Sequence, residues 1–152
     1  MKEKIYLGSD HAAFGLKEYV KDFLLKKKYE IHDLGPYDDE SVDYPDYAEK
    51  VAVKVSKAKK ARGILSCGTG IGMSISANKV PGIRAALVRT PFDAKMSREH
   101  NDSNILVLAG RPFNKNNVSK ILNIWLTAKF EGGRHARRVG KIKRLDKKYL
   151  NR

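Results

Sequence analysis

The stretch SCGTGIG, residues 66–72, decides how the rest of the chain is organised. Apolar residues 63–65 before it indicate the end of a buried strand, and residues 73–79 after it indicate a helix. A strand-to-helix turn leaves backbone N–H groups free at the positive end of the helix dipole. Its three glycines, Gly68, Gly70 and Gly72, let the backbone approach a ligand closely. The turn is therefore predicted to hold an anion, or an oxygen that becomes negative during a reaction.

Cys67, the only cysteine of the chain, stands at the mouth of this turn. A thiolate beside a helix N-terminus is stabilised, so Cys67 is a candidate nucleophile or general base. The alternative is a small apolar residue buried at a strand end, and position by itself does not separate the two. A single cysteine forms no internal disulfide, which predicts a reducing compartment, the cytoplasm.

Length and charge narrow the class of protein. A chain of 152 residues predicts one domain, 1–152, and neither a signal peptide nor a membrane-spanning run is recognisable. The formal net charge is +14, and residues 134–152 hold nine Lys or Arg and one acid. Such a basic excess favours either a nucleic-acid partner or a phosphorylated substrate.

Strand and helix patterns alternate along the chain. Short apolar runs predict strands at 4–9, 30–35, 62–66, 84–88 and 105–110. Helices are predicted after each strand, and Met73, Ile75 and Val80 are expected to hold the third against the sheet. This order predicts an α/β fold, a three-layer, doubly wound, five-stranded parallel sheet of Rossmann-like type. A last helix from Arg134 to about Leu150 has no evident place on the sheet, so it is expected to pack on a partner subunit.

Polar residues cluster where ligands of such sheets bind. Asp10 and His11 follow the first strand at its C-terminal end, although a helix cap and a loop residue would look the same. Arg134 and Arg138 are four residues apart on one helix face and could share a phosphate, or simply face solvent. His100 precedes the fifth strand, at the opposite edge, where it is either a loop residue with no role or one that reaches a neighbouring subunit's site.

Several separated motifs together resemble one family. They are GSDHAA (8–13), DYPDYA (43–48), SCGTGIG (66–72), NK (78–79), GIRAA (82–86), HN (100–101), AGR (109–111) and RHARR (134–138). In order and near-family spacing they are similar to the type B ribose-5-phosphate isomerases. The wider family includes galactose-6-phosphate isomerase subunits and allose-6-phosphate isomerases.

The resemblance implies interconversion of D-ribose 5-phosphate and D-ribulose 5-phosphate, a step of the pentose phosphate pathway, through a cis-enediolate and without metal or cofactor. It implies that Cys67 moves the proton and that Asp10, Thr69 and His100 open the sugar ring. Backbone N–H groups of the turn would hold the enediolate oxygens, namely those of Gly68, Gly70, Ile71, Gly72 and Ser74.

The remaining positions carried by the resemblance bind substrate. His11, Arg134 and Arg138 match phosphate-binding residues, Arg111 is expected close by, and Tyr44 and Asn101 match residues that contact the sugar. The family's site is shared between two subunits, which implies a homodimer, or a dimer of such dimers. A hexose-6-phosphate isomerase remains the alternative, and a nucleic-acid-binding protein is disfavoured because it leaves the His, Cys and Gly positions unexplained.

Overall fold

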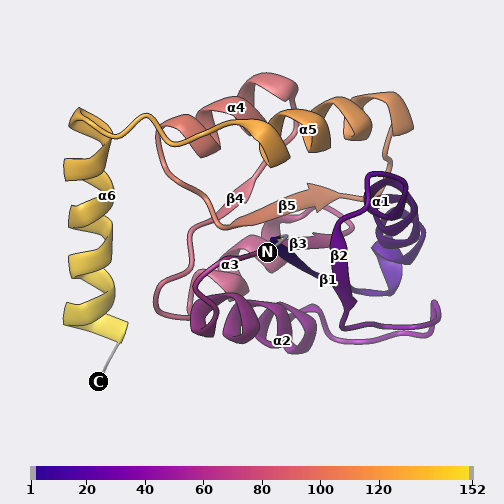
Figure 1. Cartoon of the computed structure of the whole chain (residues 1–152). Helices are drawn as coiled ribbons and strands as arrows, with labels where there is room; N and C mark the ends of the chain where they lie inside the picture. Colours follow the sequence, from indigo (N-terminus) through magenta and orange to yellow (C-terminus); the bar gives the residue numbers. More distant parts are fainter. Residues whose placement is uncertain (1–2, 151–152) are drawn as a thin grey trace.

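The computed structural model describes residues 3–150 and contains the predicted parallel sheet (Figure 1). Its strands lie in the order β2-β1-β3-β5-β4. They are β1 (Lys4–Ser9), β2 (Glu30–Asp33), β3 (Ala61–Cys67), β4 (Ala85–Leu87) and β5 (Ile105–Ala109). Each strand lies within two residues of its predicted bounds.

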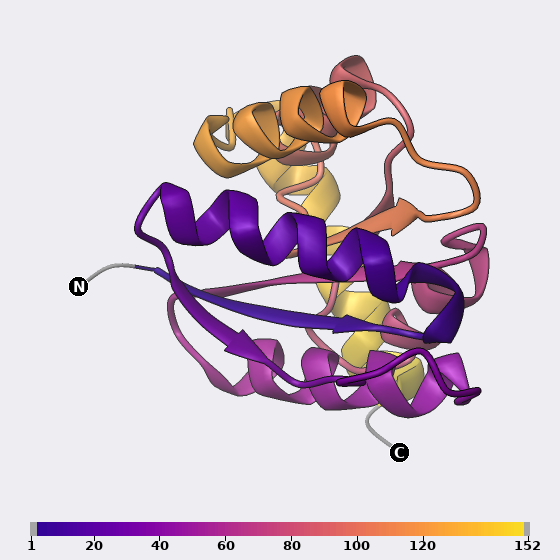
Figure 2. The same cartoon turned by 90° about the vertical axis from the view of Figure 1, so that its right-hand side faces the viewer.

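Helices cover both faces of the sheet, as the alternating pattern predicts. One face carries α1 (Phe14–Lys26), α4 (Pro91–Glu99) and α5 (Lys115–Thr127), and the other carries α2 (Tyr44–Lys57) and α3 (Ile71–Ala77) (Figure 2). A short 3-10 helix, η1 (His11–Ala13), links β1 to α1. Local capping fits these starts: Thr90 Oγ1 accepts the Asp93 N–H at 3.1 Å, and Pro91 occupies the first turn of α4.

One helix prediction is wrong in detail. Met73 is fully buried against the sheet, but Ile75 is 59 % exposed. Residues two apart on a helix lie about 200° apart, so the two side chains cannot face the same layer. Ile75 therefore stands on the outer face of α3, beside the exposed Ile71.

A buried ion pair joins α1 to the edge strand β2. The side chain of Lys17 is 1 % exposed, and its Nζ lies 2.7 Å and 2.8 Å from the two carboxylate oxygens of Asp33. Burial alone would raise the pKa of Asp33, but hydrogen bonds from Lys17, the Gly35 N–H and Lys21 lower it overall. Asp33 is thus held as the carboxylate that a buried ammonium requires.

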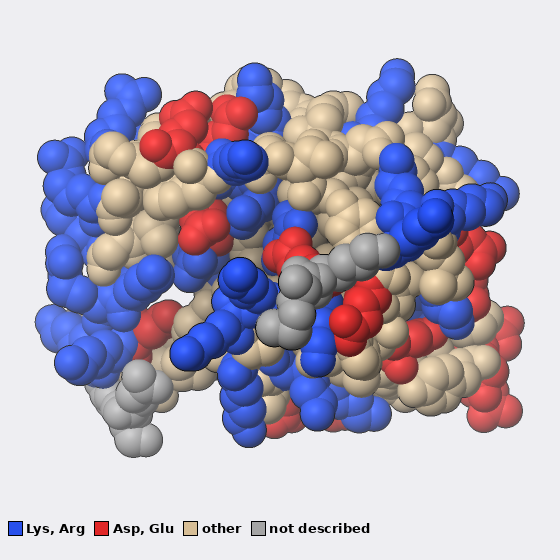
Figure 3. Space-filling view, viewed as in Figure 1, with Lys and Arg blue, Asp and Glu red and all other residues tan. Residues whose placement is uncertain are grey.

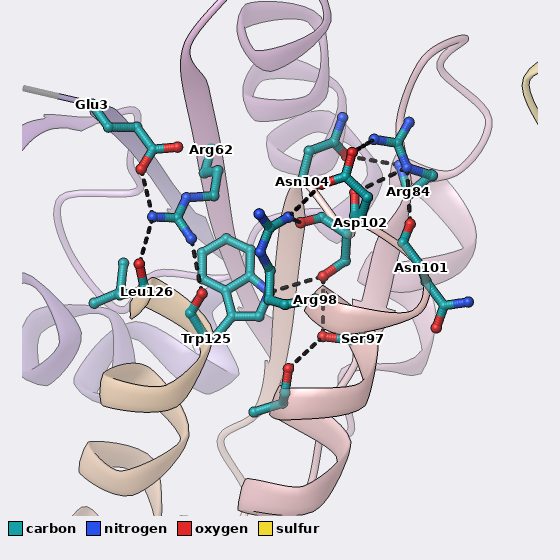
Figure 4. A network of polar contacts seen from close by, with 12 residues as sticks. Glu3, Arg62, Arg84, Ser97, Arg98, Asn101, Asp102, Asn104, Trp125 and Leu126 are labelled. Carbon is teal, nitrogen blue, oxygen red and sulfur yellow. Dashed lines mark hydrogen bonds and ion pairs between the residues drawn. The ribbon is translucent and has the colours of Figure 1, made fainter. Parts of the chain in front are cut away.

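A second polar network closes the edge where the strands begin (Figure 4). Arg62 of β3 forms an ion pair with Glu3 and donates to the carbonyls of Trp125 and Leu126 at 2.8 Å and 3.0 Å. The indole N–H of Trp125 donates to Ser103 Oγ at 2.9 Å. The polar side chains at this edge are therefore occupied by structural contacts between β3, the end of α5 and the loop before β5.

The last helix stands apart from the sheet. The predicted helix from 134 to 150 consists of α6 (Arg134–Leu145) followed by a π-helical turn, η2 (Asp146–Leu150). In Figure 1, α6 stands at the left of the molecule, beyond the left ends of α2 and α4. Val139 is buried, whereas Leu145 on the same predicted stripe is 55 % exposed. Within residues 3–150, no helix has both the length and the hydropathy of a membrane span.

Candidate active site

The sheet topology brings the predicted residues after β1, β3 and β5 together. These strands are neighbours, and the chain leaves β1 and β3 toward opposite edges, which creates the crevice where such folds bind ligands. The Asp10 N–H donates to the Ser66 carbonyl at 3.1 Å, and the Arg111 N–H donates to the Gly68 carbonyl at 3.0 Å. Asp10, Cys67 and Arg111 therefore stand side by side at the C-terminal edge.

Cys67 contacts both an apolar cluster and the polar turn. It is 4 % exposed and belongs to the apolar cluster under α2 and α3, as the structural alternative expects. Its Sγ nevertheless accepts the Gly70 N–H at 3.2 Å, so the sulfur also points at the polar turn. A hydrogen bond from backbone N–H stabilises a thiolate more than a neutral thiol.

Gly70 is the residue that shapes the turn. Its φ of +78° lies in the left-handed region, and a Cβ there would sit 2.5 Å from Leu87 Cδ1 and 3.2 Å from the Leu108 carbonyl oxygen. Only glycine fits without strain. The structure therefore requires this glycine for packing on β4 and β5, whereas its predicted close approach to a ligand stays a prediction.

Some backbone N–H groups in and just after the turn form hydrogen bonds within this segment, and others are free. Those of Gly70, Ile71 and Ser74 are bonded to Cys67 Sγ, to Thr69 Oγ1 at 3.2 Å and to the Gly70 carbonyl at 3.0 Å. Those of Gly68, Thr69 and Gly72 have no hydrogen bond to any residue among 3–150. The free groups are the ones available to an anionic oxygen.

One predicted substrate contact, Tyr44, borders the same turn, and His11 follows β1 at the same edge of the sheet. The ring of Tyr44, first residue of α2, lies so close to Gly72 that a Cβ on Gly72 would approach it to 2.6 Å. His11 is anchored by its Nδ1, which lies 3.2 Å from the Val42 N–H. Asp10 caps η1 through its Oδ1, which accepts the Ala13 N–H at 3.2 Å, so the helix-cap alternative also describes a real contact.

His100 and Asn101 lie at the opposite edge of the sheet from the turn. They occupy the loop between α4 and β5, where Asp102 is paired with Arg98 at 3.0 Å and Arg84 at 3.1 Å (Figure 4). The Arg84 side chain also donates to the Asn101 carbonyl at 3.1 Å. This loop is therefore fixed by ion pairs, at the edge where β5 begins.

Arg134 and Arg138 lie near His100 rather than near Cys67. Both guanidinium-bearing residues are exposed on α6, and His135 between them stacks on His100 with ring centroids 4.1 Å apart. Figure 3 shows Lys and Arg side chains gathered on the side of the molecule formed by α6. The terminal basic excess is thus a surface property of this helix.

The predicted residues consequently form two groups within one chain. In the β3–β5 register, Gly63 pairs with Ile105 and Cys67 pairs with Ala109, so Cys67 and the start of β5 are at opposite strand ends. A strand rises about 3.3 Å per residue, which puts these ends about 13 Å apart. The group of His100, Arg134 and Arg138 is therefore not brought to Cys67 by the fold of a single chain.

Arg89 is a candidate that the sequence reasoning missed. It follows β4 at the same edge as Cys67, and its Nη2 donates to the Thr69 carbonyl at 3.4 Å. It also lines a cavity of about 300 Å³ at the ends of β4 and β5, beside Ala109 and Pro112. The available signal was its place directly after a strand, the criterion already applied to Asp10 and His11.

Comparisons with known proteins point to one family. A family model described as Ribose/Galactose Isomerase matches residues 5–142. Ribose-5-phosphate isomerase B of Escherichia coli is 41 % identical, across 96 % of this chain and 98 % of its own.

Solved structures agree with the sequence relatives. A ribose-5-phosphate isomerase B from Clostridium thermocellum superposes with a TM-score of 0.93 at 53 % identity, covering 96 % of this chain and 99 % of the other. The Mycoplasma genitalium enzyme with bound ribulose-5-phosphate has a TM-score of 0.91 at 44 % identity, covering 95 % and 96 %.

Proposed function

The chain belongs to the ribose/galactose isomerase family, and on that premise we propose that it interconverts D-ribose 5-phosphate and D-ribulose 5-phosphate. The observation that carries the proposal is the Cys67 sulfur, bonded to the Gly70 N–H beside three free N–H groups of the same turn. The whole chain, residues 1–152, would act as one isomerase domain of the pentose phosphate pathway in the cytoplasm.

The proposed reaction moves one proton between adjacent carbons. The Cys67 thiolate removes the proton from C2 of the open-chain aldose, the C–H electron pair forms the C1–C2 double bond, and the carbonyl pair moves onto O1. The thiol then returns the proton to C1, while O2 loses a proton and O1 gains one. The N–H groups of Gly68, Thr69 and Gly72 would stabilise the cis-enediolate, and this charge stabilisation requires no metal or cofactor.

The other matched residues supply binding and ring opening. His11 and Arg111 would bind phosphate from the Cys67 side, and Arg134 and Arg138 from the α6 side. Tyr44 and Asn101 would contact the sugar. Asp10, Thr69 and His100 would open the furanose, a step in which one oxygen loses a proton and another gains one.

We propose that a second copy of the chain completes the site, within a homodimer or a dimer of dimers. Two observations support this. His100 and the α6 arginines lie at the opposite strand ends from Cys67. In addition, α6 and α3 expose apolar side chains, Leu145 at 55 % and Ile75 at 59 % among them, that one chain leaves uncovered.

Mixing two inactive variants tests the shared site. Cys67→Ala and His100→Ala subunits, co-expressed in equal amounts, form hybrid dimers in which one of the two sites has both residues. Half of the dimers are hybrids, so about one quarter of the wild-type activity is expected. Activity no higher than that of either variant alone would contradict a shared site.

The activity itself is tested on purified protein with a chelator present. Ribose 5-phosphate, allose 6-phosphate and galactose 6-phosphate are compared, and we expect the highest kcat/KM with ribose 5-phosphate. Cys67→Ser is expected to abolish turnover while the melting temperature stays near that of the wild type. Turnover that survives Cys67→Ser excludes the cysteine as base, a hexose phosphate preference moves the assignment to the alternative, and a requirement for divalent metal contradicts the mechanism.

A further inference from the structure

Three side chains with acid–base chemistry meet where the end of α4 approaches the start of α6. Glu131 lies between two histidines: its Oε2 is 3.5 Å from His135 Nε2 and 4.0 Å from His100 Nε2. The two imidazole rings are stacked, with an interplanar angle of 12°. Of the three residues, only His100 has a part in the proposed reaction.

His135 is held as a neutral ring. It is 5 % exposed, and burial lowers its pKa, as do the nearby positive charges of His100, Arg134 and Arg138, against the opposing effect of Glu131. Its Nδ1 lies 3.4 Å from Nη1 of Arg138. A guanidinium only donates, so Nδ1 is the acceptor and the ring proton sits on Nε2. This buried Nε2 has no hydrogen-bond partner among residues 3–150, and Glu131 lies 3.5 Å from it.

Glu131 is fixed by its own backbone. Its N–H donates to the Glu99 carbonyl at 3.0 Å, which ties it to the residue directly before His100. Two residues later, Gly133 caps the N-terminus of α6, and a carboxylate is favoured at that positive helix end. The backbone of Glu131 is therefore held beside His100, and its half-exposed carboxylate lies within reach of both histidines.

We propose that Glu131 and His135 are positioning residues for His100: the carboxylate directs Nε2, the stacked ring fixes the imidazole plane, and Nδ1 is left to face the sugar. The inference rests on the ring-opening role proposed above for His100. The 4.0 Å separation is long for a hydrogen bond, and catalytic contacts of this kind tighten when substrate binds. Through His135, the same contacts connect His100 to Arg138, a proposed phosphate ligand.

The test uses Glu131→Gln, which keeps the size of the side chain and removes its charge. We expect kcat for ribose 5-phosphate to fall about tenfold or more, with KM changed less than about twofold. The expected loss is a part of what a general acid or base contributes to the rate. Glu99→Gln is the matched control, since that carboxylate faces Lys95 at 3.9 Å instead, and it should leave kcat unchanged.

A second readout separates positioning from a general structural effect. Ribulose 5-phosphate has no furanose to open, so enzyme-catalysed uptake of solvent deuterium at its C1 reports proton transfer alone. Glu131→Gln should keep this exchange rate within about twofold, because removal of the carboxylate leaves the Cys67 turn untouched. Equal loss of exchange and turnover would overturn the positioning role.

His100→Ala distinguishes failure of this inference from failure of the proposed function. If His100→Ala keeps full turnover of ribose 5-phosphate, the proposed ring-opening role itself is wrong. If His100→Ala loses turnover while Glu131→Gln behaves like Glu99→Gln, the ring-opening role stands and the positioning role is refuted.

Discussion

Replacement of Gly70 by alanine tests whether the turn after β3 is held by backbone geometry. Its φ of +78° costs an L-residue about 1–2 kcal/mol. The new Cβ would also lie 2.5 Å from Leu87 Cδ1 and 3.2 Å from the Leu108 carbonyl oxygen. Overpacking of this kind costs about 1–3 kcal/mol, so Gly70→Ala should lose about 2–5 kcal/mol of unfolding free energy.

Gly82→Ala separates the two contributions. Gly82 has a similar φ of +83°, but no atom lies within 4 Å of the position of its Cβ. This control should lose only the backbone part, about 1–2 kcal/mol. The difference between the variants therefore measures the clash with β4 and β5.

Urea unfolding gives the unfolding free energies of Gly70→Ala and Gly82→Ala. Both variants are measured at one protein concentration, because the stability of an oligomer depends on protein concentration. Gly70→Ala should also lower kcat for ribose 5-phosphate at least about tenfold, since the Gly70 N–H no longer aligns with Cys67 Sγ. Equal unfolding midpoints for Gly70→Ala and Gly82→Ala would refute the packing argument. Full activity in a destabilised Gly70→Ala would refute the role of the N–H.

Two further substitutions probe the contacts that hold the sheet. Asp33→Asn leaves the Lys17 ammonium buried without its main partner and should cost about 3–5 kcal/mol in urea unfolding. Burial raises the pKa of Asp33, but the hydrogen bond from Lys17 and the other contacts lower it overall. The stability that the ion pair contributes is therefore present above about pH 4 and is lost as the pH falls through the lowered pKa. An acid titration that unfolds wild type and variant in parallel would contradict this. Ser103→Ala removes the acceptor of the buried Trp125 N–H and should cost about 1–3 kcal/mol, whereas Ser56→Ala, whose hydroxyl bonds a carbonyl at the surface, should cost almost nothing.

The sequence was sufficient where its signals are local. The alternation of apolar strands and helical stripes predicted the parallel sheet, because a strand buried on both faces has to be uniformly apolar. Glycines 68, 70 and 72 predicted the tight turn, and the strand-end rule predicted Asp10 at the edge where β3 leads into that turn. These conclusions need only the nearest neighbours along the chain and the direction of the strands.

Tertiary structure decided what depends on contacts between distant segments. The exposure of Ile75, the stacking of His100 on His135 and the Arg89 contact to the turn all involve elements whose packing no local pattern specifies. The separation of Cys67 from His100, by contrast, was already expected from their places at the end and before the start of parallel strands, and the β3–β5 register confirms it. A sequence names the residue types, but the distances between them are fixed only when helices and strands pack, because packing energy is shared among many residues.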